Sequence, residues 1–266
     1  MAEAGFRGAT LTQRLSVRDR VIVLSALMAA ATLAWAYVLY LSWGMEHMDA
    51  GVAMAIMPSM TDWGAIDLLL VLVMWAIMMA AMMLPSIVPM VLIFTSLSRQ
   101  RRAQELPYVH TSVFVLGYLV VWSGFSVLAT LAQWGLLEAR LVTPMMVSAT
   151  PLLGGSLLVF AGVFQFTPLK HACLSKCASP LGFLLTEWRD GTIGAWIMGF
   201  RHGAYCVGCC WLLMALLFVF GVMNVLWVAV LSIYVVLEKM LPQVRWLRFA
   251  QGLLMIGWGI AVAMTT

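Results

Sequence analysis

Apolar residues run along this chain in long unbroken stretches, and the short segments between them hold most of the charged residues. A helix needs about 20 apolar residues to cross the hydrocarbon core of a bilayer. The stretches are continuous rather than alternating, which favours helices over the strands of a membrane barrel. The pattern predicts seven membrane-spanning helices, at residues 21–43, 66–97, 110–134, 151–166, 196–220, 222–240 and 246–265.

Composition strengthens this interpretation. Only 10% of the 266 residues are charged and the mean hydropathy is +0.99, whereas a soluble domain carries roughly 25% charged residues. So few charges cannot cover a surface in water, so the lipid bilayer is the expected solvent. The predicted fold class is all-α, a polytopic helical bundle.

The basic residues predict which side each connection faces, because cytoplasmic loops are enriched in Lys and Arg. With seven helices and a cytoplasmic N-terminus, 14 of the 15 Lys and Arg fall on the cytoplasmic side, and only Arg140 falls on the other. This distribution into short clusters, at a net charge of +4, does not indicate nucleic-acid binding.

The same division predicts the domains. We expect a cytoplasmic tail at 1–20 and one membrane domain at 21–266, with an outer loop at 44–65 and a cytoplasmic cysteine loop at 167–195. The first apolar stretch is longer than that of a signal peptide, so we expect it to be retained. The expected location is the inner (plasma) membrane, crossed several times.

A group of soft metal ligands lies in the fifth predicted helix, in the segment RHGAYCVGCCWLLM at 201–214. Residues four apart share one face of a helix. Such a row contains His202, Cys206, Cys210 and Met214, and Cys209 lies beside it. Thiolate and thioether ligands suit Cu(I), while imidazole with thiolate also suits zinc. The plainer alternative is that buried cysteines pack as small apolar residues.

A second cysteine pair precedes this helix, in the predicted cytoplasmic loop. Cys173 and Cys177 are four residues apart, and Lys170 and Lys176 supply a basic setting for their thiols. If the loop folds back onto the fifth helix, the two thiols join the helix cysteines in one site. The alternative is two unrelated loop cysteines.

Methionine is the third candidate ligand, with 21 in the chain. Met45, His47 and Met48 lie in the acidic outer segment, where thioethers can bind Cu(I) without being oxidised to disulfides as thiols are. A stripe of methionines in the second helix extends this set toward the cysteines as a possible path. The alternative is that these side chains fill the core.

One charged pair lies near the cytoplasmic end of the sixth helix. Charges inside a bilayer are costly unless they are paired or reach water. We interpret Glu238 and Lys239 as structural, with Glu238 paired to Arg201 and Lys239 extending to the interface. No phosphate-binding loop or serine-nucleophile motif occurs in the sequence, so an enzymatic role is not indicated by motifs of that kind.

The paired-cysteine loop followed by the YCVGCCW segment resembles an uncharacterised prokaryotic family described as predicted metal-binding integral membrane proteins. The resemblance implies metal binding, without a defined metal or reaction. One departure is Ala178, where a basic residue is expected in the family. The matching segments are AMMLPS (81–86), GVFQFTPLKHACLSKCASP (162–180), GFRHGAYCVGCCWLLM (199–214), GVMNVLW (221–227) and EKMLP (238–242).

Three functions fit these observations. The leading hypothesis is a membrane protein that binds copper as Cu(I) and transports it or delivers it to a partner such as a metallochaperone. A structural subunit of a larger membrane complex, with a metal that only staples the fold, is the second. A membrane thiol-disulfide oxidoreductase using the Cys206–Cys209 spacing is the third.

Overall fold

The computed structural model describes residues 17–46, 63–103, 109–141, 150–241 and 245–265, and every regular element in these ranges is a helix. The all-α prediction is therefore confirmed for this part of the chain. Four helices are long: α1 (Val17–Glu46), α3 (Ala65–Ala103), α4 (Thr111–Glu138) and α8 (Gly191–Ala215). The shorter ones are α5 (Pro151–Phe164), α6 (Pro168–Cys177), α7 (Pro180–Glu187), α9 (Leu217–Phe220), α10 (Val225–Met240) and α11 (Arg245–Ala263).

The number of membrane crossings differs from the prediction. Four segments are long and apolar enough to cross: Arg18–Gly44, Ala65–Arg101, Thr111–Glu138 and Gly191–Phe220. Helices α5 and α6 meet at a bend of 67°, and they add a fifth crossing if they form one broken span. Seven crossings and a cytoplasmic N-terminus are not supported. The number of crossings is lower than predicted because α10 and α11 are helical as expected but shorter than the four long helices.

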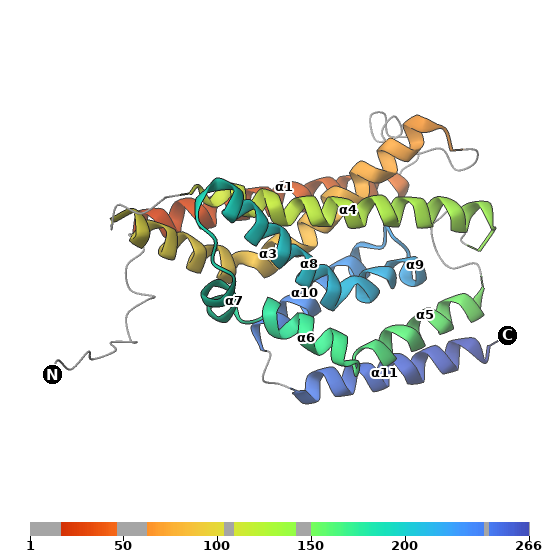
Figure 1. Ribbon diagram of the computed structural model, residues 1–266. Coiled ribbons are helices and arrows are strands. Elements are labelled where there is room, and N and C mark those ends of the chain that lie inside the picture. Colours follow the sequence, from red (N-terminus) through yellow and green to blue (C-terminus); the bar gives the residue numbers. More distant parts are fainter. Residues whose placement is uncertain (1–16, 47–62, 104–108, 142–149, 242–244, 266) are drawn as a thin grey trace.

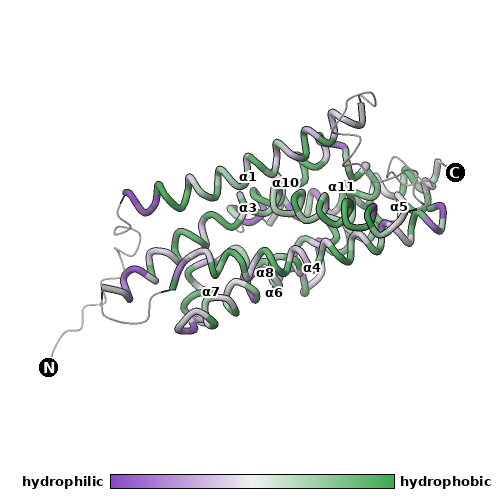
Figure 2. The backbone as a smooth tube through the Cα atoms, turned by 90° about the horizontal axis from the view of Figure 1, so that it is seen from above, coloured by the Kyte–Doolittle hydropathy of each residue, from purple (hydrophilic) through white to green (hydrophobic). Residues whose placement is uncertain are grey.

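The surface of the described helices fits a lipid environment. Large apolar side chains such as Leu33, Leu128 and Leu254 are exposed, and apolar exposure on this scale is unfavourable in water. Figure 2 shows green, apolar colouring along most of the helices, with several purple stretches near helix ends. These helices are therefore suited to a bilayer.

Glycines bring α4 and α8 into close contact (Figure 1). A Cβ on Gly199 would overlap the backbone carbonyl of Phe114, and one on Gly117 would overlap that of Trp196. In lipid, helices associate mainly through packing and hydrogen bonds, so small residues that let backbones approach are favoured at such contacts. This contact fixes α8, the helix with three cysteines, against α4.

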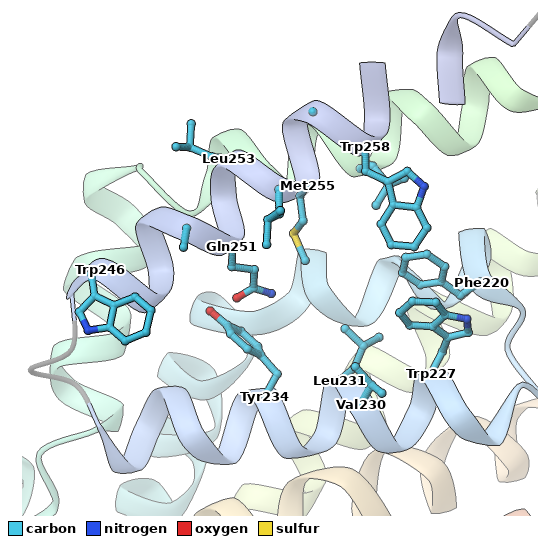
Figure 3. A pocket seen from close by; sticks show the side chains of 14 residues that line it. Phe220, Trp227, Val230, Leu231, Tyr234, Trp246, Gln251, Leu253, Met255 and Trp258 are labelled. Atoms are coloured by element: carbon cyan, nitrogen blue, oxygen red, sulfur yellow. The ribbon is translucent and has the colours of Figure 1, made fainter. Parts of the chain in front are cut away.

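A second glycine contact joins α5 to α11. A Cβ on Gly155 would lie 2.5 Å from the carbonyl oxygen of Gly259. The α5–α11 pair lies side by side in Figure 1. An apolar groove of about 1130 Å³ separates α11 from α10, and aromatic side chains including Trp227, Tyr234 and Trp258 line it (Figure 3).

Two local features of the helices are notable. Pro85 and Pro89 lie inside α3, and the helix continues through both of them. The segment expected to be a cytoplasmic loop at 167–195 instead forms helices α6 and α7 and the start of α8. The proline at the first turn of each short helix, Pro168 and Pro180, explains this, because proline is favoured at that position.

Candidate metal centre

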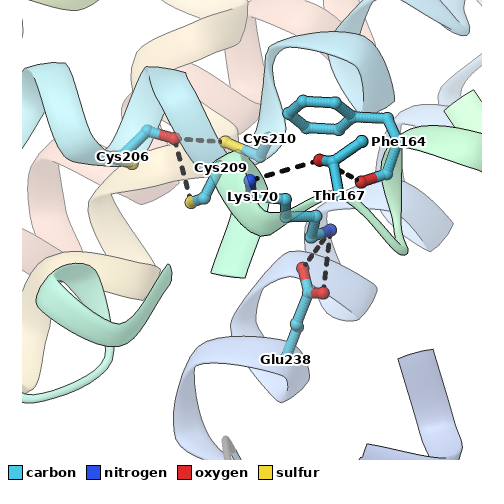
Figure 4. Close-up of polar contacts among 7 residues, drawn as sticks. All are labelled: Phe164, Thr167, Lys170, Cys206, Cys209, Cys210 and Glu238. Carbon is cyan, nitrogen blue, oxygen red and sulfur yellow. Dashed lines mark hydrogen bonds and ion pairs between the residues drawn. The ribbon is translucent and has the colours of Figure 1, made fainter. Parts of the chain in front are cut away.

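The three cysteines of α8 point into the core. Cys206, Cys209 and Cys210 are all buried. The thiols of Cys209 and Cys210 donate to the carbonyl oxygen of Cys206 at 3.1 and 2.9 Å, as Figure 4 shows. Residues three and four apart lie on one face of a helix, so the thiols of Cys209 and Cys210 both lie near Cys206.

A fourth thiol comes from α6. Cys177 is buried, and its side chain interacts with those of Cys206 and Cys209. The bend between α5 and α6 directs α6 toward α8. Thr167 caps α6 by accepting from the Lys170 amide, and its hydroxyl donates to the Phe164 carbonyl at 2.8 Å (Figure 4). One threonine thus joins the end of α5 to the start of α6.

Cys173 lies one turn earlier on α6, at the edge of this group, and is only partly buried. Its sulfur would lie 2.8 Å from a Cβ placed on Gly208 in α8. The absence of a side chain at Gly208 therefore makes room for the Cys173 thiol. The structure brings the two predicted cysteine sets together, with Cys177 inside the group and Cys173 beside it.

Two residues that were not predicted as part of the site contact Cys206. The Lys239 ammonium, on α10, donates to the Cys206 sulfur at 3.0 Å and to the Ser86 hydroxyl at 2.7 Å. The Tyr118 hydroxyl, on α4, shares a hydrogen bond of 3.1 Å with the same sulfur. Lys239 is buried, so the prediction that its ammonium extends to the interface was wrong. Its place in an apolar helix beside Glu238 was the one available signal, since charges at such positions are often functional.

The neighbouring ion pairs also differ from the prediction. Glu238 pairs with Lys170, whose Nζ lies 2.8 Å from one carboxylate oxygen and 3.0 Å from the other (Figure 4). Both side chains are buried. Arg201 instead pairs with Glu187. Lys170 is therefore not the cation that faces the thiols, and that position is taken by Lys239.

His202 and Met214 lie on the predicted row of α8, and both are buried. The His202 ring packs among aromatic rings, with centroids 5.2 Å from Phe183 and 5.9 Å from Tyr118. Its Nδ1 has no hydrogen-bond partner among the described residues. His202 therefore stands one turn from Cys206 inside an aromatic enclosure.

The outer methionine set cannot be placed. His47 and Met48 lie outside the described residues, as does the side chain of Met45 at the end of α1. In α3, the stripe formed by Met74, Met78 and Met82 is buried in the core. Packing, the plainer interpretation, accounts for that stripe.

The clustered thiols and the ammonium beside them indicate which metal ions could bind. Four thiols lie together, all five cysteines of the chain are free, and one ammonium contacts the group. No three His, Cys, Asp or Glu side chains in the described ranges have the geometry of a ready metal site. Thiolates prefer soft ions such as Cu(I), which two thiolates can hold, so a preformed group of three is not required. Zinc also binds thiolates, with four ligands in structural sites, so the donor set by itself fits a soft or borderline metal ion and does not choose between copper and zinc.

We compared the chain with known proteins to find its family. No curated protein and no solved structure matches the chain. The profile of the PpoB2 family, described as a copper chaperone, matches residues 72–262. This match covers the helices that carry all five cysteines, Lys239 and Tyr118. The chain belongs to the PpoB2 family of copper chaperones.

Proposed function

We propose that this protein is an integral membrane copper chaperone that holds Cu(I) on thiolates and passes it to a partner protein. The observation that carries the proposal is the buried contact of Cys177 with the α8 cysteines beside Lys239. We assign Cys177, Cys206, Cys209 and Cys210 as the thiols from which the copper ligands are drawn. Delivery is favoured over conduction because the family is described as one of copper chaperones.

Charge balance supports Cu(I) and limits the number of ligands. A buried site is costly unless its charges are compensated. Cu(I) with two thiolates carries one negative charge, and the Lys239 ammonium neutralises it. Zinc with four thiolates would carry two negative charges, of which Lys239 could balance only one. We therefore infer a single Cu(I) on two thiolates, with the remaining cysteines as neutral thiols available for exchange.

The experiment is a metal analysis of the purified protein. The wild type and the Cys206→Ser/Cys209→Ser/Cys210→Ser variant are loaded anaerobically with Cu(I) and, separately, with zinc, and then desalted. The wild type should retain about one Cu(I) per chain, by the charge balance above, and the triple variant should lose it. Cys173→Ser is the matched control and should retain copper. Equal copper in the wild type and the triple variant would exclude the proposal.

A further inference from the structure

A small cavity lies beside the cluster of four thiols formed by Cys177, Cys206, Cys209 and Cys210, where α3, α10 and the α6–α7 connection meet. Its volume is about 180 Å³. Cys177 and Lys239, both buried, stand among its walls, and the half-exposed Met240 stands at its margin. The other lining residues are Ser86, Pro89, Met90, Ala178 and Pro180.

Two of the lining residues, Cys177 and Lys239, also contact the cysteines of α8. Cys177 lines the cavity and interacts with Cys206 and Cys209. The Lys239 ammonium bridges the Ser86 hydroxyl in the cavity wall and the Cys206 sulfur. An ion in the cavity therefore meets Cys177 before it meets the cysteines of α8.

The lining also carries two neutral soft ligands. Met90 and Met240 contribute thioethers from α3 and α10. A thioether binds Cu(I) without losing a proton and more weakly than a thiolate, so it can hold the ion in passing. The volume fits a metal ion with one thiol side chain and excludes a folded peptide segment.

We propose that this cavity is the port through which Cu(I) is exchanged, with Cys177 as the transfer ligand and the Met90 and Met240 thioethers as transient ligands. The inference rests on the proposed function. The incoming Cu(I) arrives on a cysteine thiolate of a donor protein. A bond forms between copper and the Cys177 sulfur as the donor sulfur–copper bond breaks. The Cys177 proton passes to the departing thiolate, and copper stays Cu(I) throughout.

Cys173 defines the competing route. It is partly buried and lies against Gly208, one helical turn before Cys177, and it is not among the residues that line the cavity. Exchange through Cys173 would bypass Ala178 and Met240. Variants of the cavity lining and of Cys173 can therefore tell the routes apart.

The test separates the rate of exchange from the amount of copper bound. In Ala178→Phe, a ring fills the cavity and no sulfur is removed. Ala172→Phe, on an exposed position of α6, is the matched control. Each protein is loaded with Cu(I) in detergent, and release to a chromophoric Cu(I) chelator is followed by stopped flow. Ala178→Phe should bind the same copper as the wild type and release it at least tenfold more slowly, and Ala172→Phe should match the wild type.

A second, more conservative variant tests the port in case Ala178→Phe does not fold. Met240→Leu keeps the size of the side chain and removes the thioether, and it should slow release several-fold, whereas Met264→Leu, far along the chain at an exposed position, should not. Unchanged release in both Ala178→Phe and Met240→Leu would overturn the port, as would slow release in Cys173→Ser alone. A wild type that binds no copper would instead contradict the proposed function.

Discussion

Lys239 shows how one buried charge shapes the site. Its ammonium donates hydrogen bonds to the Ser86 hydroxyl and the Cys206 sulfur. An ammonium in an apolar interior is unfavourable without an anion nearby. In the proposed site a thiolate on Cys206 supplies that anion, and Cu(I) on a thiolate pair would leave one negative charge for Lys239 to balance. In this proposal Lys239 stabilises the ligand without binding the metal.

We expect Lys239→Met to weaken Cu(I) binding by about 10- to 100-fold, the usual loss when a partner of a metal ligand is removed. Chelator competition at fixed pH measures the affinity. Lys176→Met removes the same charge from α6, and in the described part of the chain no hydrogen bond or ion pair joins Lys176 to the thiols, so this control should bind like the wild type. Equal affinities for Lys239→Met and the wild type would exclude the charge-balancing role.

The Lys170–Glu238 pair connects α6 to α10 just beside Lys239. Both charges are buried, so removing one leaves the other uncompensated, at a cost of about 3–5 kcal/mol. We expect Lys170→Met to lower the free energy of unfolding by that amount. The Lys170→Met/Glu238→Leu double variant should recover most of the loss. Chemical unfolding in mixed micelles measures both, and a double variant as unstable as the single one would contradict this account.

At the scale of elements, the site exists because three sets of contacts hold five helices together. The glycine contact fixes α8 to α4, the Thr167 bend directs α6 to α8, and the Lys239 hydrogen bonds attach α10 and α3. Each contact positions one component: Tyr118 from α4, Cys177 from α6 and the ammonium from α10. Loosening one contact should therefore change copper binding without touching a ligand.

Gly199→Ala tests this. A Cβ at this position overlaps the Phe114 carbonyl, so α8 must move away from α4 and the Tyr118–Cys206 hydrogen bond must lengthen. We expect a lower melting temperature and weaker Cu(I) binding, measured by thermal unfolding and chelator competition. Gly124→Ala is the matched control on α4, because nothing lies within 4 Å of its Cβ position. Equal behaviour of the two variants would show that this contact does not support the site.

The sequence predicted the elements better than their contacts. The apolar stretches predicted helices correctly, and the four-residue spacing placed His202, Cys206 and Cys210 on one buried face of α8. The pairing of Glu238 was predicted wrongly, because its true partner Lys170 is 68 residues away and reaches it only through the α5–α6 bend. Lys239 was missed as a site residue for the same reason, since 33 residues separate it from Cys206. Local periodicity contains no information on such distant pairs.

At the scale of the whole molecule, the short helices complicate the membrane topology. Helix α10 has 16 residues and so extends about 24 Å, less than the ~30 Å of a hydrocarbon core. Helix α11 has 19 residues and is separated from α10 by the apolar groove. The buried Lys239 ammonium, at the end of α10, contacts Cys206 near the middle of α8. Cys210 lies five residues before Ala215, the C-terminal end of that helix.

The ends of the bundle lead to a test of topology. Figure 1 places the start of α1 and the end of α11 at opposite ends of the long axis shared by α1, α3 and α4. Because these helices are long and apolar enough to cross a bilayer along that axis, we expect the two chain ends on opposite sides of the membrane, which requires an odd number of crossings. Reporter fusions that are active on only one side, placed after Thr266 and before Met1, measure this in cells. Opposite activities agree with five crossings, in which α5 and α6 form one broken span, whereas equal activities would require an even number and would make that pair re-entrant.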